Sequence, residues 1–488
     1  MSFSRRRFVE WAASTAALAA SARLRGHLAA AALDDRAPGF RPELLPSQPA
    51  VWDQQVWMAK LGPKYTGNQA HTTFVDFLAA EFKATGCEIV RDSYRLPRWD
   101  ARRWEVTITP ASGQPFKAPV TSYFPYSGQT SAAGVTGELA FAGSNPTFTL
   151  TNLQGKVALI DFATATREWS RLYKPWGVHA SGESFPAAYR PARGGVNDLT
   201  PFQKAGAVAV VLAWTDISDA NAADQYTPFS RPPQGLPGLF VGRDTGARLK
   251  AQAAAGAKAT VVLEAEVFQD TPTDTIIATL PGAAADEIVI VNTHTDGPNA
   301  TEENGALGIL ALAKYFAKIP KNQRRRTLVF PLTTGHFAGP WVPSIRGVIE
   351  KHPDLISRAV AAVTVEHLGC REWMDAMRYT SSGKNEWSIA ITPNRVMGES
   401  LVAALEGSRD RAAVVNPVNG GWLGEGSRLS RAGIPTIGYI PQPNYLLAGP
   451  ADGCIDKLSP ELLHSQIQVF ARLLHAIERL DRAVLKGA

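Results

Sequence analysis

The chain has 488 residues, 45% of them hydrophobic and 19% charged, with a formal net charge of +6. This length exceeds one ordinary domain, so we expect two or three domains with enough apolar residues to bury a large core. Part of the positive charge lies near the N-terminus and in Arg324 to Arg326, and no long basic stripe interleaves with aromatic residues, which argues against nucleic acid as a partner.

The N-terminus has the order of a signal peptide. Three arginines at 5–7 precede an alanine-rich apolar run at 11–22, and small residues at 29–32 suit cleavage. The run is too short for a comfortable membrane span, and the paired arginines resemble the twin-arginine export signal, a route that carries folded proteins. We therefore predict a signal peptide over 1–32 and an exported protein, periplasmic or extracellular, with an amphipathic surface helix as the alternative. No other segment has the length and apolarity of a transmembrane helix.

The kind and length of the predicted elements change near residues 116 and 270. Before the first change, apolar residues at helical spacing predict a helix over 70–85, and strands follow from Glu88. Within 116–270, short strands alternate with Gly- and Pro-rich turns, as expected for a small β-rich domain inserted into a larger one. The larger domain would then consist of residues 33–115 and 271–488.

Beyond residue 270, strands and helices alternate. The run at 288–291 is a continuous apolar strand of the kind buried on both faces, and a helix is expected over 304–317. Further strands are expected at 328–330 and 363–365, and a C-terminal helix with one apolar stripe at 460–480. This alternation predicts an α/β fold in which a mostly parallel central sheet carries helices on both faces.

Three of the predicted strands end in side chains that could bind a metal ion. These strands lie at 288–292, 327–332 and 361–365, and ligands of open α/β sheets bind beyond the carboxyl ends of strands. Mixed histidine and carboxylate ligation suits zinc. The candidate residues are His294, Asp296, Glu302, Glu303, His336, Glu366 and His367.

Each candidate alone has a simpler interpretation. A single histidine after a strand is more often a hydrogen-bonded structural residue, Asp296 could belong to a turn, and Glu302 and Glu303 could stabilise a helix N-terminus. Glu366 is different, because an acid directly after a buried strand needs a partner. The joint pattern is more specific than any member and favours a metal site.

Segments along nearly all of the mature chain resemble one family. The segments that carry the resemblance are Leu61 to Gly67 with the helix at 70–85, Gly155 to Val157, Lys204 to Ala207, Ile277 to Gly282 and Gly433 to Thr436. Their order is similar to that of the zinc aminopeptidases, the metallopeptidase family 28 type, which includes glutamate carboxypeptidase and the glutaminyl cyclases. Within 116–270 the resemblance is to the protease-associated domain often inserted in that family.

The resemblance implies roles for several candidates. His294 matches the first zinc ligand, and Asp296 matches the residue that orients it. Glu303 before Asn304 matches a bridging aspartate, and Glu366 matches the acid that completes the first zinc site. Zinc is therefore the implied cofactor, with one ion expected and two as the alternative.

The chain departs from the family at two places. Gly335-His336 stands where the family has a pair of glutamates, the first a general base and the second a ligand of the second zinc. His336 could take the place of that ligand. The family also has a late histidine ligand after a tyrosine, whereas Tyr445 is followed by two leucines and the next histidine is His464. An ordinary two-zinc peptidase is therefore not implied.

Three functions remain open from the sequence. The favoured one is a metal-dependent hydrolase of an amide, a peptide or a related small molecule, with zinc on His294, Glu303 and Glu366 and His336 nearby. A family member that has lost catalysis and acts as a binding protein is the second, and a cyclase or lyase using the same pocket is the third. The groups that could accept a proton from the attacking water are His336, Glu302 and His367.

Overall fold

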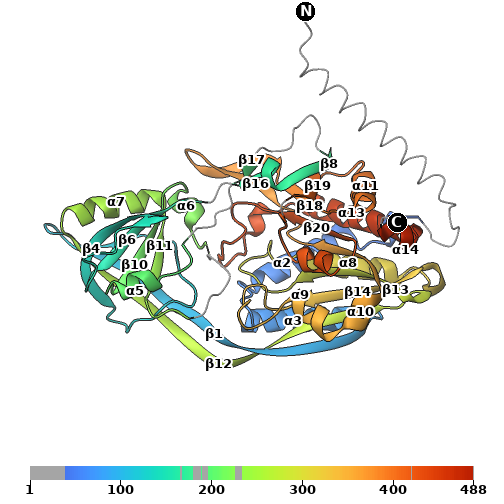
Figure 1. Cartoon of the computed structure of the whole chain (residues 1–488), viewed down its shortest axis with the longest axis horizontal. Coiled ribbons are helices and arrows are strands. Elements are labelled where there is room, and N and C mark those ends of the chain that lie inside the picture. The colour runs from blue at the N-terminus through green and yellow to red at the C-terminus, as the bar shows by residue number, and fades with distance from the viewer. Residues whose placement is uncertain are drawn as a thin grey trace, which may run out of the picture.

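The computed structural model describes residues 39–164, 167–179, 188–189, 196–225, 233–418 and 420–486, and the predicted signal peptide at 1–32 lies outside this part of the chain. Two lobes are joined by a long antiparallel ribbon (Figure 1). The ribbon consists of β1 (Glu88–Thr109) and β12 (Lys258–Leu280), which are paired along almost their whole length. The sequence predicted strands from Glu88 onward, and the structure has one continuous strand with two register shifts in its pairing.

The larger lobe is built on a mostly parallel sheet. Strand order across it is β12-β14-β13-β15-β20-β18-β19-β8, with parallel pairs β14–β13, β13–β15, β15–β20 and β18–β19. The strands are β13 (Ala284–His294), β14 (Arg326–Thr333), β15 (Ala359–Val365), β20 (Thr436–Pro441), β18 (Trp387–Ile391), β19 (Arg411–Pro417) and β8 (Tyr173–His179). In the centre, β14, β15 and β20 are fully buried, as expected for strands covered on both faces.

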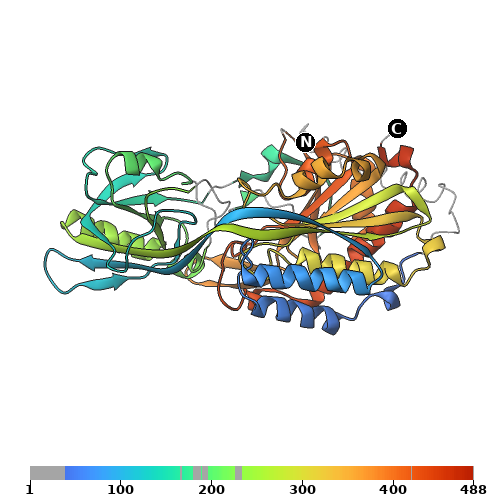
Figure 2. The same cartoon turned by 90° about the horizontal axis from the view of Figure 1, so that it is seen from below.

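Helices cover both faces of this sheet. Alternate side chains of β13 enter different cores, with Val289 and Val291 on one face and Ile288 and Ile290 on the other. The first face carries α2 (Gln48–Lys60), α3 (Gln69–Ala84), α8 (Gly305–Ala317), α11 (Arg395–Ala404) and α13 (Pro460–Arg479). The second face carries α9 (Ile345–Lys351), α10 (Pro353–Arg358) and α12 (Gly426–Arg431). Figure 2 shows α2 and α3, in blue, along one side of the sheet. This arrangement confirms the predicted α/β fold class.

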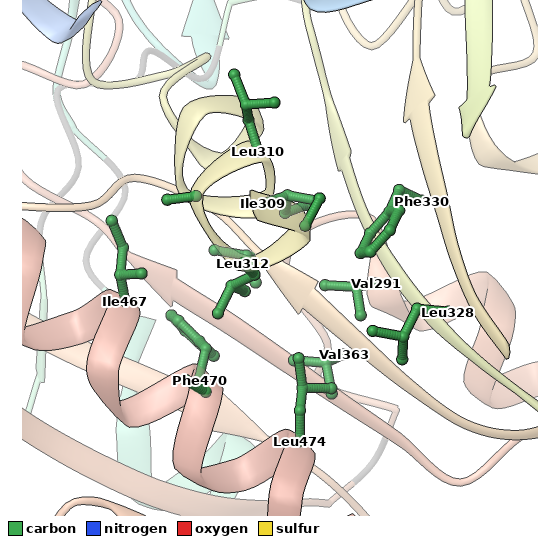
Figure 3. Packing of buried hydrophobic residues seen from close by; sticks show 14 of the residues in the cluster. Val291, Ile309, Leu310, Leu312, Leu328, Phe330, Val363, Ile467, Phe470 and Leu474 are labelled. Atoms are coloured by element: carbon green, nitrogen blue, oxygen red, sulfur yellow. The ribbon is translucent and has the colours of Figure 1, made fainter. Parts of the chain in front are cut away.

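The C-terminal helix α13 illustrates how the sequence produces this packing. Ser459 caps its N-terminus by accepting a hydrogen bond from the Leu462 amide, and Pro460 occupies the first turn, where its missing N–H costs nothing. Its apolar stripe meets α8 and the strands, so that Ile467 and Phe470 lie against the sheet core (Figure 3). The prediction of a helix here from apolar spacing agrees with the structure.

The smaller lobe continues the same sheet from β12 through β4, β6, β10 and β11 to β3. Its elements are β2 (Phe116–Ala118), β3 (Ser122–Tyr123), β4 (Val135–Ser144), β5 (Thr147–Phe148), β6 (Val157–Phe162), α5 (Thr200–Lys204), β10 (Ala209–Trp214), α6 (Asp219–Ala222), β11 (Gly238–Val241) and α7 (Arg243–Ala254). It has apolar clusters of its own on both faces. Within 116–270, however, β8 pairs with β19 of the larger lobe. The assignment of 116–270 to a protease-associated domain stays a prediction.

The remaining elements are short. They are η1 (Pro42–Leu44), β7 (Arg167–Glu168), α4 (Trp169–Leu172), β9 (Ala188–Tyr189), η2 (Lys321–Gln323), β16 (Arg371–Asp375), β17 (Tyr379–Asn385), η3 (Ile455–Lys457) and α14 (Arg482–Lys486). Of the helices in the described ranges, none combines the length and the apolar character that a membrane crossing requires.

Candidate metal centre

The candidate site lies at the carboxyl edge of the central parallel strands. β13 ends at His294, opposite Thr333 at the end of β14, and β15 ends one residue before Glu366. Because these strands are parallel neighbours, the loops that follow them meet at one edge of the sheet. The loop between β13 and α8 brings two further acids, Glu302 and Glu303, to the same place. All of the acidic and histidine side chains that converge here are almost fully buried, except that of His336.

Three ligand-type side chains converge closely in this buried region. One ligand atom each from His294, Glu302 and His367 lies within 4.8 Å of the other two. The Nε2 atom of His367 is 3.1 Å from Oε2 of Glu302. Glu366 faces the same point, since its Oε2 is 3.6 Å from Nε2 of His294 and 3.9 Å from Nε2 of His367. Two imidazole nitrogens and one carboxylate oxygen therefore converge, and the Glu366 carboxylate adjoins both imidazoles.

The two histidines are held so that Nε2 faces the cluster. Nδ1 of His294 donates to the backbone carbonyl of Asp296 at 2.9 Å, and Nδ1 of His367 donates to the carbonyl of Pro441 at 2.7 Å. These hydrogen bonds place the ring proton on Nδ1 and leave the lone pair of Nε2 for a ligand, an arrangement common among metal-binding histidines.

The cluster attracts positive charge. Burial disfavours the charged form of His294, but the adjoining carboxylates of Glu366 and Glu302 outweigh it and raise its pKa to about 10. Burial likewise opposes the charge of His367, and Glu302 and Glu366 raise its pKa. The pKa of Glu302 is lowered, because the histidines overcome the effect of burial. A metal ion that binds here would therefore compete with a proton for His294.

The donor atoms are of the types that bind zinc and are suitably placed to do so. Nε2 of His294, Oε2 of Glu302, Oε2 of Glu366 and Nε2 of His367 are buried and make no hydrogen bond of acceptable geometry with the described residues. These atoms contact one another as charged pairs, and buried polar atoms without a well-formed hydrogen bond require an explanation, of which an ion is one. Nitrogen and carboxylate oxygen are ligands that zinc takes in fourfold coordination.

Glu303 has a different partner. Its Oε1 lies 3.8 Å from the ammonium of Lys64, and both side chains are completely buried. Burial and the charge of Glu302 raise the pKa of Glu303 to about 8 against the opposing effect of Lys64, and burial lowers the pKa of Lys64. Lys64 lies in the turn between α2 and α3, where no periodic pattern marks it, and the sequence did not indicate it as a site residue.

His336 lies beside the cluster and is paired with Glu425. Its ring stacks on that of His294 with the centroids 4.1 Å apart and an interplanar angle of 11°. Its Nδ1 is 2.6 Å from Oε1 of Glu425, whose other oxygen accepts hydrogen bonds from Ser344 and the Ile345 amide. Burial opposes the charge of Glu425, but the hydrogen bond and charge of His336 prevail and lower its pKa to about 2.

Glu425 was not among the residues that the sequence indicated. It follows Gly424, which has φ of +74° and lies where an added Cβ would come within 2.3 Å of Oε1 of Glu366. The backbone amide of Glu425 donates to that same oxygen at 2.9 Å. The signal in the sequence is a single acid within a glycine-rich stretch, Gly420 to Gly426, where close backbone approach is expected.

Asp296 connects two of the loops. Its backbone carbonyl orients His294, while its carboxylate accepts hydrogen bonds from Thr66 Oγ1 at 2.6 Å and from the backbone amides of residues 335–337 at 3.0–3.2 Å. The resemblance implied that Asp296 orients His294, and here the carbonyl makes that contact. The carboxylate instead fixes the segment that presents His336.

Asn304 connects the other two loops. Its Oδ1 accepts a hydrogen bond from the Leu368 amide, and its Nδ2 donates to the Leu368 carbonyl, both at 2.7 Å. The neighbouring His367 has φ of +58°, a left-handed conformation that costs a non-glycine residue free energy and persists where the surroundings hold it. The amide of Gly369 is bound by Gln466 of α13 at 2.7 Å.

The structure thus brings together four of the seven predicted site residues, His294, Glu302, Glu366 and His367. Glu303 and His336 were both predicted as ligands and lie at the edge of this group with other partners, Lys64 and Glu425. His464, the histidine nearest in sequence to the family's late ligand, contacts the carbonyl of Pro46 instead. Which residues bind metal stays a prediction.

No protein-family model matches the sequence, and no curated protein matches it. Solved structures do match. A peptidase M28 precursor from Shewanella amazonensis SB2B is similar with a TM-score of 0.61 and 16% identity, over 88% of this chain and 97% of that one. The zinc aminopeptidase BSAP from Bacillus subtilis is similar with a TM-score of 0.58 and 17% identity, over 88% and 95%. An aminopeptidase from Aneurinibacillus sp. strain AM-1 is similar with a TM-score of 0.55 and 18% identity, over 88% and 93%. The chain therefore has the zinc aminopeptidase-like fold, which confirms the resemblance predicted from the sequence at the level of fold.

Proposed function

We propose that this protein is a zinc-dependent hydrolase of an amide or peptide bond. The observation that carries the proposal is the convergence of buried donor atoms from His294, Glu302 and His367, which lie within 4.8 Å of one another, with Oε2 of Glu366 3.6 Å from Nε2 of His294. None of these atoms makes a hydrogen bond of acceptable geometry with the described residues. In this proposal Glu302 and His367 act as ligands, in place of the Glu303 and His336 favoured by the resemblance. The names of the structural neighbours, which are peptidases, support a peptide or related amide as the substrate class.

Different residues would bind the metal, transfer the proton and orient the group that transfers it. Zinc bound at the four donors would polarise a carbonyl and lower the pKa of a water molecule. His336 is the candidate proton acceptor, because its side chain is 16% exposed while those of the four donors are at most 3% exposed, so it lies on the side that a substrate can reach. Glu425 is bound to Nδ1 of His336, and we assign the proton transfer to Nε2, as in other histidine–carboxylate pairs.

The test combines metal analysis with an activity screen. Purified protein is expected to contain zinc and to hydrolyse members of an aminoacyl and acyl-amide library between about pH 6 and 9, where histidine can act as a base. His294→Ala should lose both metal and activity, whereas His464→Ala, a matched control on α13, should keep both. Protein that carries no zinc and is inert across the library would contradict the hydrolase proposal and favour a binding protein. A cyclised or eliminated product in place of a hydrolysed one would favour the cyclase or lyase.

Two further proposals concern the rest of the chain. We propose that residues 1–32 direct export by the twin-arginine route, which suits a protein that is folded and loaded with its metal before it crosses the membrane. We also propose that 116–270 is a protease-associated-like insert. It is supported by the ribbon of β1 and β12 that leads into the smaller lobe and back.

A further inference from the structure

A buried lysine stands beside the proposed metal centre. The ammonium of Lys64 is 3.8 Å from Oε1 of Glu303, and neither side chain is exposed to solvent. It donates a hydrogen bond to the carbonyl of Gly62 at 2.8 Å and a longer one to that of Met58 at 3.4 Å. Both oxygens of Glu303 lack a hydrogen bond of acceptable geometry among the described residues, so the charge of this acid depends on the nearby cation.

The backbone fixes this lysine relative to the acids. Lys64 and Gly297 form an antiparallel bridge, in which the Lys64 amide donates to the Gly297 carbonyl at 2.8 Å and the reverse bond is 3.0 Å long. Gly297 lies three residues after His294 and packs directly on the acids. A Cβ there would lie 2.5 Å from Cγ of Glu302 and 3.1 Å from Oε1 of Glu303. The ammonium is therefore placed by the same loop that places His294.

The balance of charge in this region favours a single metal ion. Glu302, Glu303 and Glu366 contribute three negative charges when ionised, and the charge of Asp296 is stabilised separately by four hydrogen bonds. One ammonium and one divalent cation neutralise the three glutamates when both histidines are neutral ligands. Beside the ammonium, a second divalent ion would leave an excess of two buried positive charges, against an excess of one where the lysine charge is absent, and buried unpaired charge is costly in a region of low dielectric.

We propose that this site binds one metal ion and that the ammonium of Lys64 takes the position next to Glu303 that a second ion would otherwise occupy. This inference rests on the proposed zinc-dependent function and sets its metal stoichiometry. Glu303 then serves as the counter-ion of the lysine and not as a bridging ligand. The lysine supplies positive charge at the edge of the site without requiring coordination or exchange with solution.

The experiment is a count of bound zinc by elemental analysis, together with calorimetric titration of the metal-free protein. The wild-type protein is expected to bind one equivalent, and Lys64→Met, which keeps the unbranched stem of the side chain and removes its charged end, is expected to bind two. Lys314→Met is a matched control, since Lys314 pairs with Glu81 at the surface, and it should bind one. In the double variant Lys64→Met/Glu303→Gln both charges are absent, so it should bind one equivalent again and fold even if Lys64→Met does not.

The outcomes separate this inference from the function on which it rests. A wild-type count of zero overturns the proposed zinc-dependent function. A wild-type count of two overturns only the role of Lys64. A count of one in folded Lys64→Met also overturns it, because the lysine would then not set the number of ions. If Lys64→Met does not fold, the double variant decides, and loss of zinc from it would show that Glu303 is a ligand.

Discussion

The Asn304 amide offers a sharp test of how the site is held together. It satisfies both backbone groups of Leu368, directly after His367, and is itself buried. In Asn304→Ala the amide and the carbonyl of Leu368 lose this hydrogen-bond partner while they remain buried away from water. Each buried unsatisfied group costs about 1–3 kcal/mol, so the free energy of unfolding should fall by roughly 2–6 kcal/mol, less roughly 1 kcal/mol if His367 relaxes from its left-handed conformation.

Relaxation of His367 would move its Nε2 away from Glu302, so zinc affinity should fall as well. Loss of a residue that orients a metal ligand typically weakens metal binding about 10- to 100-fold. The assays are urea unfolding of the metal-free protein and competition with a zinc chelator. Hydrogen exchange at the Leu368 amide, which donates to Asn304, should become faster in the variant.

Asn394 supplies a matched control for this prediction. It also joins one backbone amide and one backbone carbonyl, those of Met397 and Leu485, but it caps α11 outside the site. Asn394→Ala should therefore lower stability while zinc affinity stays unchanged. Equal zinc affinity in Asn304→Ala and the wild type would refute the argument that this amide positions His367.

Four other outcomes are expected. Glu425→Gln should keep its zinc while turnover falls about 10- to 150-fold, because a hydrogen bond to a charged group contributes roughly 1.5–3 kcal/mol; parallel loss of zinc would contradict this. Chelation of the metal should lower the melting temperature and added zinc should restore it, whereas an unchanged temperature would argue against a bound ion. Burial and nearby arginines lower the pKa of His475 to about 4. The unfolded chain binds this proton near pH 6.5, so stability should fall as the pH decreases from 7 to 4, by about 2 kcal/mol at pH 5, and His475→Gln should lose less over that range in urea titrations. Replacement of both arginines at 5–6 by lysine should trap the precursor inside the cell, and normal export in a fractionation assay would exclude the twin-arginine route.

The fold could be predicted because its central strands have an unambiguous pattern. A run such as Ile288 to Val291 is apolar at every position, which only a strand covered on both faces tolerates, and the alternation with helices then implies a parallel sheet. The ends of these strands in turn place His294 and Glu366 at one edge. Both steps need only local sequence and the general geometry of parallel sheets.

The choice between neighbouring acids could not be made in the same way. Glu302 and Glu303 are adjacent in a turn, so their side chains point in different directions, and spacing does not say which one faces the histidines. The structure decides through a contact with Lys64, which is more than 200 residues away in the sequence. Glu425 was missed for a similar reason, since its partner His336 comes from a different loop.

Three side chains hold the loops of the site by hydrogen bonds. Asp296 ties the loop after β13 to the segment at 335–337, Asn304 ties it to Leu368, and Glu425 ties His336 to the turn before α9. The donors are therefore positioned by hydrogen bonds within the protein and do not require the metal for their geometry. This preorganisation strengthens the binding of an ion. The loops are already ordered, so little of the free energy of coordination is lost in ordering them. It follows that metal removal should lower stability without changing the secondary structure, unlike small domains that fold only around their metal.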